Sequence, residues 1–197
     1  MRDPAYRNLA GWLPLPYIVL DVETTGLSPK NDRVIEIAIL ERAKNGSALK
    51  KWTTLINPGR SIPVEVQALT GIADRAVANS PNFGQIAANL RTRLHGKLIV
   101  AHNADFDCSF LKAELARVAI DFEANTLCTL QLARSLFPEF RRHNLQSLAD
   151  SLGLPLAGQH RALADAQVLV SLLDLIDQRF PSTRLQQLVG ALISRPV

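Results

Sequence analysis

Four carboxylates and one imidazole, in three separated stretches of the chain, have the types and spacing to form one metal site. Asp21 and Glu23 lie in IVLDVETTGL, Asp107 ends VAHNADFD, and His160 and Asp165 lie in HRALADA. Each stretch adjoins an apolar segment, so gathering these acids is unfavourable unless a cation binds between them. Hard divalent cations prefer oxygen ligands such as carboxylates. The pattern therefore predicts a divalent-metal site.

The first two acids belong to a predicted strand over residues 17–23. Asp21 and Glu23 are two residues apart, so both side chains leave the same face of the strand. Their like charges repel each other, and the interior of a strand is unfavourable for Asp. A bridging dication would remove both problems. The alternative is a frayed strand end that faces water.

The third acid lies near the start of a helix predicted over residues 106–119. On this helix, Asp107 shares a face with Leu111 and Leu115, so we expect its carboxylate to point inward. Asp105 precedes the helix and is interpreted as its N-cap. The alternative for Asp107 is a first-turn acid that the helix dipole favours.

The last two candidates lie at the start of the longest predicted helix, residues 162–180. Its apolar stripe is Ala162, Ala166, Leu169, Leu172, Leu173 and Ile176. Asp165 falls within this stripe, where a lone carboxylate is costly. His160 is five residues earlier and cannot share a helical face with Asp165. The two side chains can converge only if His160 lies in the loop before the helix; otherwise His160 is an ordinary surface residue.

The remaining elements place these residues in a mixed α/β fold. Strands are predicted over 33–42, 51–57 and 97–101, and residues 127–136 start extended and become helical. Helices are predicted over 83–94, 144–152 and 184–194, with Asn144 as N-cap and Gly153 at the helix end. Short loops favour an antiparallel meander for the first three strands. Helices then cover a mixed five-stranded sheet.

Composition indicates a globular protein with a modest basic excess. The 197 residues carry a net charge of +4 and are 47% hydrophobic. This charge permits a polyanionic partner without demonstrating one. Cys108 and Cys128 lack zinc-type spacing and are expected to be reduced thiols. No signal-peptide pattern or membrane-spanning segment is visible, so the prediction is a cytoplasmic protein with no membrane contact.

The three motifs VLDVETTGL, VAHNADFD and HRALADA resemble those of the DEDD superfamily of 3′–5′ exonucleases. Within it, the chain resembles the epsilon proofreading subunit of bacterial DNA polymerase III and its stand-alone relatives. The likeness covers roughly residues 17–180. It implies a ribonuclease H-like fold, with an N-terminal arm at 1–16, an exonuclease domain at 17–180 and a helical extension at 181–197. His160 stands where the histidine (DEDDh) branch has its histidine, and Arg161 where another branch has tyrosine.

The resemblance assigns roles to the five candidates. Two ions, Mg²⁺ or Mn²⁺, would be held by four carboxylates, those of Asp21, Glu23, Asp107 and Asp165. Our hypothesis is that Asp21 bridges both ions, that Glu23 and Asp165 complete the first site, and that Asp107 serves the second. His160 would act as general base, a role that suits an imidazole. The implied products are nucleoside 5′-monophosphates released from a 3′ end.

The same resemblance suggests contacts to single-stranded 3′ ends. Thr24, Thr25, Leu27 and Asn103 would bind substrate: Thr25 the 3′-hydroxyl, Leu27 the last base and Asn103 a phosphate. Alternatives are turn residues for the threonines, core for Leu27 and helix entry for Asn103. The stretch LTGIAD (69–74) resembles a segment that approaches the family's site. However, Thr70 stands where the polymerase subunit has a histidine.

Three interpretations of function remain open at this point. DNA is favoured as the substrate, and an RNA exonuclease of the same branch is the alternative, since discrimination depends on contacts to the 2′-hydroxyl. A third possibility is a non-catalytic nucleic-acid-binding or polymerase-associated module. The apolar stripe Leu185, Leu188, Val189, Leu192 and Ile193 either packs on its own domain or docks a polymerase or a second copy.

Overall fold

The computed structural model describes residues 12–14, 16–42, 49–155 and 160–194. Most of the predicted N-terminal arm lies outside the described residues, and its boundary at residue 16 stays a prediction. Trp12 and Leu13 are buried against the rest of the chain.

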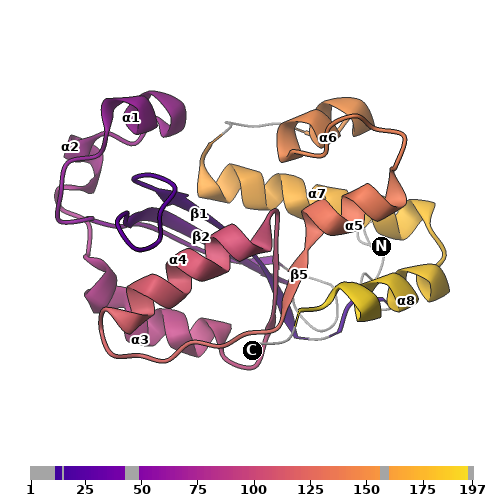
Figure 1. The fold of residues 1–197 in the computed structure, drawn as a ribbon, viewed down its shortest axis with the longest axis horizontal. Helices are drawn as coiled ribbons and strands as arrows, with labels where there is room; N and C mark the ends of the chain where they lie inside the picture. Colours follow the sequence, from indigo (N-terminus) through magenta and orange to yellow (C-terminus); the bar gives the residue numbers. More distant parts are fainter. Residues whose placement is uncertain (1–11, 15, 43–48, 156–159, 195–197) are drawn as a thin grey trace, which may run out of the picture.

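The centre of the fold is the predicted mixed five-stranded sheet (Figure 1). Its order is β3 (Leu49–Leu55), β2 (Val34–Arg42), β1 (Tyr17–Thr24), β4 (Leu98–Ala101) and β5 (Thr126–Cys128). The first three strands form an antiparallel meander, and β4 and β5 extend it in parallel with β1. Short loops explain the meander, and the parallel strands are reached through helical crossovers.

Eight helices are found in the described residues. They are α1 (Val64–Thr70), α2 (Asp74–Val77), α3 (Phe83–Leu94), α4 (Ala104–Ala116), α5 (Thr129–Leu136), α6 (Leu145–Leu152), α7 (Ala162–Arg179) and α8 (Ser182–Leu192). The short helices α1 and α2 were not predicted, and they lie together at one end of the molecule (Figure 1). None of the helices described is both long and apolar enough to cross a membrane.

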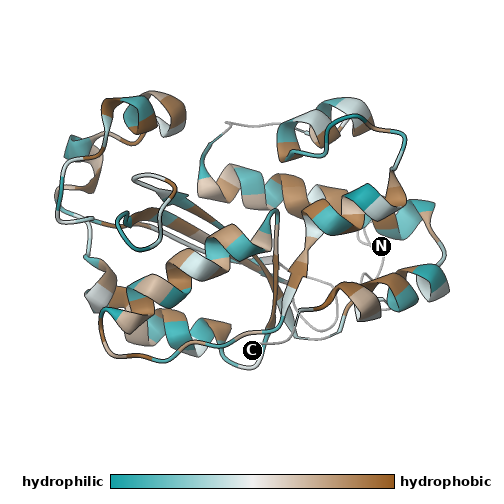
Figure 2. Ribbon diagram, viewed as in Figure 1, coloured by the Kyte–Doolittle hydropathy of each residue, from teal (hydrophilic) through white to brown (hydrophobic). Residues whose placement is uncertain are grey.

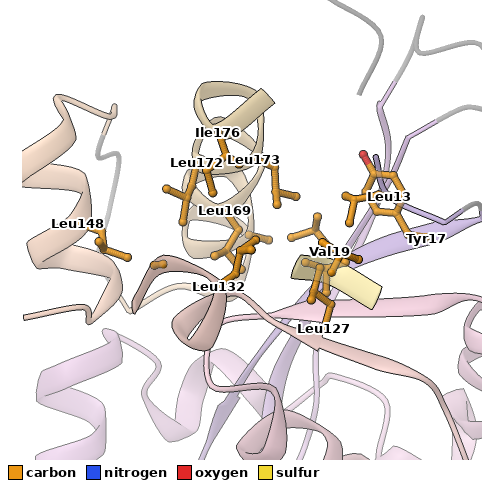
Figure 3. Packing of buried hydrophobic residues seen from close by; sticks show 14 of the residues in the cluster. Leu13, Tyr17, Val19, Leu127, Leu132, Leu148, Leu169, Leu172, Leu173 and Ile176 are labelled. Carbon is orange, nitrogen blue, oxygen red and sulfur yellow. The ribbon is translucent and has the colours of Figure 1, made fainter. Parts of the chain in front are cut away.

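Strand alternation divides the core into two layers. Tyr17 and Val19 of β1 point into a cluster with residues of α5, α6, α7 and α8, part of which is drawn in Figure 3. Ile18 and Leu20 point to the other face, where α3 and α4 cover them. Hydrophobic residues run along the strands, whereas the helices mix hydrophobic and hydrophilic positions (Figure 2). Both faces of the sheet are thus covered, as parallel strands require.

The structure corrects one predicted helix start. Asn103, with φ 71° and ψ 51°, is the N-cap residue of α4, and the helix begins at Ala104. Asp105 is therefore a first-turn residue and not the N-cap that the sequence suggested. In contrast, α6 has the predicted ends: the Asn144 side chain accepts a hydrogen bond from the Ser147 N–H, and Gly153 ends the helix in the left-handed conformation.

The C-terminal helix α8 is part of the domain core. Leu185 and Val189 are buried in the cluster beneath α7, whereas Leu188 is only partly covered. Beyond the helix, Ser194 exchanges two 3.0 Å backbone hydrogen bonds with Thr126 of β5. The buried side of the stripe therefore packs on its own domain. Docking of a partner through this segment stays a prediction. Such a partner would have to contact the more exposed side of α8.

Replacing Leu185 by Ala should lower the free energy of unfolding by about 2–5 kcal/mol, because it leaves a cavity in a packed cluster. Leu188→Ala is the matched control, and its loss should be clearly smaller because Leu188 is partly exposed. Urea denaturation followed by circular dichroism measures both. Equal small losses would show that α8 is not part of the core.

Candidate active site

The acidic residues of the first motif lie in the second half of β1, which does not pair with β4. Strand β4 pairs only with Tyr17–Val19, so the second half of β1 has one open edge. Asp21 and Glu23 follow Tyr17 and Val19 on the face toward α7, and both keep some exposure to solvent. The end of β1 thus presents two carboxylates at an accessible edge of the sheet.

Asp165 meets these two acids from α7. One carboxylate oxygen each of Asp21, Glu23 and Asp165 lies within 4.8 Å of the other two. Asp165 lies in the first turn of α7, and the buried stripe of that helix holds it against the sheet. Three acids from two distant segments therefore surround one point, which is the geometry that a divalent cation needs.

Asp107 reaches the same region from the opposite face of the sheet. It is 3% exposed, and its Oδ1 accepts a 3.2 Å hydrogen bond from the backbone N–H of Val22. This N–H lies at the open edge of β1, beyond the reach of β4. The charge of Asp107 raises the pKa of Asp21, so the two acids interact although Asp107 is not one of the three clustered ligands.

His160 lies in the loop directly before α7, where the two side chains of the third motif can converge. Its φ is 54°, in the left-handed region, and its side chain is exposed. Burial raises the pKa of Asp165, and the charge of His160 and a hydrogen bond from the His160 backbone to the Asp165 carboxylate partly oppose this rise. The imidazole is free to face a substrate that approaches from solvent.

The acids strongly perturb one another. Burial, followed by the charges of Asp165 and Glu36, raises the pKa of Glu23 from 4.5 to about 8. Burial also raises the pKa of Asp107 to about 8. The pKa of Asp21 is raised well above its ordinary value by burial and then by Asp107 and Asp165. At neutral pH this group cannot be fully charged without a compensating cation.

The loop after β1 has the candidate substrate contacts. The hydroxyl of Thr24 donates to the Gly26 carbonyl at 2.6 Å. The hydroxyl of Thr25 donates to Asp32 at 3.3 Å and accepts from the Arg33 N–H at 3.0 Å. Both threonines are therefore engaged in holding the loop. Leu27 at its tip is 85% exposed, which excludes the core alternative.

Two other predicted positions have clear local roles. Asn103 is exposed at the entry to α4, and its side chain makes no capping hydrogen bond. Thr70 ends α1, where its hydroxyl donates to the Val66 carbonyl and accepts from the Ile72 N–H. The side chain of Asn103 thus remains available, whereas Thr70 is committed to the turn.

The sequence analysis overlooked two polar residues, the buried Glu36 and the half-buried His102. Glu36 of β2 pairs in register with Glu23 and binds Arg161. His102, whose ring bonds the Thr129 hydroxyl and the His143 carbonyl, has its pKa lowered to about 4 by burial, so it is neutral at neutral pH. An acid inside the apolar run VIEIAIL was the available signal for Glu36.

A sheet of this order with an acidic cluster beside β1 has the architecture of a ribonuclease H-like nuclease. Residues 18–173 match the exonuclease family, and the chain belongs to this family of nucleic-acid hydrolases.

Two curated relatives show where such a domain occurs. The chain is 38% identical to the 3′–5′ exonuclease DinG of Bacillus subtilis (strain 168) over 154 residues, 77% of this chain and 16% of that protein. It is 33% identical to the PolC-type DNA polymerase III of Clostridium perfringens (strain 13 / Type A) over 157 residues, 80% of this chain and 11% of that protein. The chain thus spans a small part of either relative.

Solved structures support the fold. Exonuclease X in complex with 5′-overhanging duplex DNA is 24% identical with a TM-score of 0.65, covering 89% of this chain and 100% of that one. Exonuclease I of E. coli in complex with a dT13 oligonucleotide is 18% identical with a TM-score of 0.76, covering 87% of this chain and 42% of that one.

Divalent cations should stabilise the protein more as the pH rises. Between pH 4.5 and about 8, the folded protein holds a proton on Glu23 that the unfolded chain has released. Folding stability of the metal-free protein is therefore lost through this window, and protons compete with metal at its lower end.

The rise in melting temperature caused by Mn²⁺ should thus be larger near pH 8 than near pH 4.5. Scanning calorimetry with Mn²⁺ or EDTA at both values measures it, and Asp21→Asn, which removes a ligand, is the control. A Mn²⁺ effect that is independent of pH, or is retained in the variant, would contradict the assignment of these acids.

Proposed function

We propose that this chain hydrolyses phosphodiester bonds at the 3′ end of DNA in a metal-dependent reaction and releases nucleoside 5′-monophosphates. The observation that carries the proposal is the convergence of the Asp21, Glu23 and Asp165 carboxylates within 4.8 Å, with Asp107 coupled to them. Membership of the exonuclease family and the likeness to a 3′–5′ exonuclease support the reaction and its direction.

The donor set fits Mg²⁺ or Mn²⁺. All four acids offer hard oxygen ligands, and burial raises the pKa of each, so a bound cation would favour their charged forms. Asp21, Glu23 and Asp165 would hold one ion, and Asp21 with Asp107 would hold a second. Such ions, when bound, acidify an attacking water and stabilise the leaving oxygen.

His160 is proposed to remove a proton from the attacking water, as in the histidine branch. Its imidazole is exposed, and it adjoins Asp165 through its backbone, so it borders the acidic cluster without being buried in it. An imidazole is the side chain most often used for proton transfer at neutral pH. The left-handed backbone conformation of His160 turns the chain toward α7, which begins at Ala162.

Recognition of the terminal nucleotide is assigned to the loop after β1 and to α1. Leu27 and Leu69 are large apolar side chains that are 85% and 55% exposed. Apolar contact of such side chains with the face of a terminal base would be tolerant of sequence, because every base has an apolar face. Thr24 and Thr25 shape the loop, with the Thr25 hydroxyl proposed to contact the 3′-hydroxyl, and Asn103 is proposed to contact a phosphate.

Asp21→Asn should reduce cleavage at least about 1,000-fold, because it removes the ligand proposed to serve both ions. The assay follows a 5′-labelled single-stranded DNA, and a matched RNA in parallel, with Mg²⁺, Mn²⁺ or EDTA. Wild-type protein should give a ladder that shortens from the 3′ end, faster on DNA. Wild-type activity in the variant would refute the site, and faster cleavage of RNA would reassign the substrate.

Leu27→Ala should raise KM for single-stranded DNA about tenfold, since covering a Leu side chain with an apolar surface gains roughly 1.5 kcal/mol or more. The melting temperature should stay unchanged because Leu27 is exposed. Val118→Ala, just after the C-terminal end of α4, is the control for an exposed apolar residue. Steady-state kinetics on DNA measures both variants, and an unchanged KM in Leu27→Ala would exclude the proposed contact.

A further inference from the structure

A fifth carboxylate lies beside the acidic cluster without belonging to it. Glu36 of β2 is 3% exposed and is the register partner of Glu23. Paired residues of neighbouring strands project to the same face, so Glu36 faces α7 as Glu23 does. In the described residues, the acids that could share one ion are Asp21, Glu23 and Asp165, and Glu36 is not one of them. It needs a different explanation.

In the described part of the chain, the side-chain hydrogen bonds of Glu36 come from the start of α7. Its carboxylate accepts from Arg161 Nε at 3.1 Å, from Arg161 Nη2 at 2.8 Å and from the Ala162 N–H at 3.0 Å. A bidentate guanidinium and a backbone donor together fix the carboxylate in orientation as well as in distance. These bonds hold both carboxylate oxygens toward the start of the helix, and Glu36 is not among the three described acids that could share one ion.

These bonds supply the cap that α7 lacks. Arg161 is the N-cap residue of the helix, and its side chain makes no capping hydrogen bond. Glu36 satisfies the N–H of Ala162 from the neighbouring sheet and places a negative charge at the positive end of the helix. The helix is thus capped by the strand β2 instead of by its own sequence.

The capped turn carries two of the proposed functional residues. His160 immediately precedes Arg161 and is held at φ 54°, a conformation that a residue other than glycine keeps only where its surroundings enforce it. Asp165 follows one turn later, and its N–H bonds the Arg161 carbonyl at 3.0 Å. The position of Arg161 therefore determines where both residues stand relative to Glu23.

We propose that Glu36 and Arg161 are a positioning pair. They touch neither the metal nor the substrate, and they hold Asp165 and His160 of α7 in register with Asp21 and Glu23 of β1. The inference rests on the proposed function, because it concerns the assembly of the same site. It adds two residues that contribute to the proposed function by holding the start of α7 in place.

The chain contains a matched control for this pair. Glu114 of α4 is 1% exposed and accepts from Arg33 Nε at 2.8 Å, Arg33 Nη2 at 2.9 Å and the Val34 N–H at 3.0 Å. Like Glu36, Glu114 combines one buried carboxylate, one bidentate arginine and one backbone donor, and it also pairs with Arg117 Nη1 at 3.4 Å. Glu114 joins α4 to the start of β2.

The test is Mn²⁺ affinity, measured by electron paramagnetic resonance on the whole chain. Glu36→Gln should weaken Mn²⁺ binding about 10–100-fold, the usual effect of losing a partner that orients metal ligands. Glu114→Gln should lower the melting temperature about as much as Glu36→Gln does, and it should leave Mn²⁺ affinity near the wild-type value. Equal affinities for wild type and a folded Glu36→Gln variant would overturn the proposal.

Arg161→Ala separates positioning from simple charge. The Arg161 side chain is 47% exposed, so this variant is expected to fold even where Glu36→Gln does not. Removing a cation beside the site should strengthen Mn²⁺ binding if the pair acts only through charge. Positioning predicts the opposite, a weakening similar to that of Glu36→Gln. Unchanged or stronger binding in Arg161→Ala would therefore refute the positioning role.

Hydrogen exchange in the metal-free protein distinguishes this proposal from the function on which it rests. Faster exchange of the Ala162 and Asp165 amides in Glu36→Gln, but not in Glu114→Gln, would support the anchor whether or not metal binds. Unchanged exchange would overturn it. The proposed function fails if the wild-type protein does not bind Mn²⁺, or if Asp21→Asn binds Mn²⁺ as tightly as the wild type. Hydrogen exchange alone would then decide whether Glu36 and Arg161 anchor the start of α7.

Discussion

The feature on which the site depends is the mutual repulsion of carboxylates gathered at the open edge of one strand. Burial raises the pKa of Glu23 and of Asp107 to about 8, and burial together with the charges of Asp107 and Asp165 raises the pKa of Asp21 well above its ordinary value. A protein gains nothing in stability from such an arrangement on its own. A bound cation attracts every carboxylate of the cluster, so it offsets both their mutual repulsion and the cost of burying their charges.

The sheet and the helices supply the rigidity that holds the acids together against this repulsion. Strand β1 fixes the spacing of Asp21 and Glu23, and the buried stripe of α7 presses Asp165 against them. Asp107 is fixed from the other face by the N–H of Val22, which is open because β4 is short. Each acid thus comes from a differently packed element, and the site exists only when both core layers are formed.

The sequence predicted the strands, the long helices and the acids, because alternation and helical stripes leave a strong signal. It missed α1 and α2, since helices of seven and four residues are too short to show a period. It misplaced the start of α4, because the left-handed conformation of Asn103 is not visible in residue types. Glu36 was overlooked because its role depends on Arg161, a partner 125 residues away.

The most direct test of the central claim is a crystal structure of the protein grown with Mn²⁺, with anomalous diffraction recorded at the manganese edge. The account predicts an anomalous peak bound by oxygen atoms of Asp21, Glu23 and Asp165, with carboxylate–metal distances near 2.2 Å. Absence of a peak at this position under saturating Mn²⁺, with the three acids hydrogen-bonded to one another as protonated carboxyls, would contradict it.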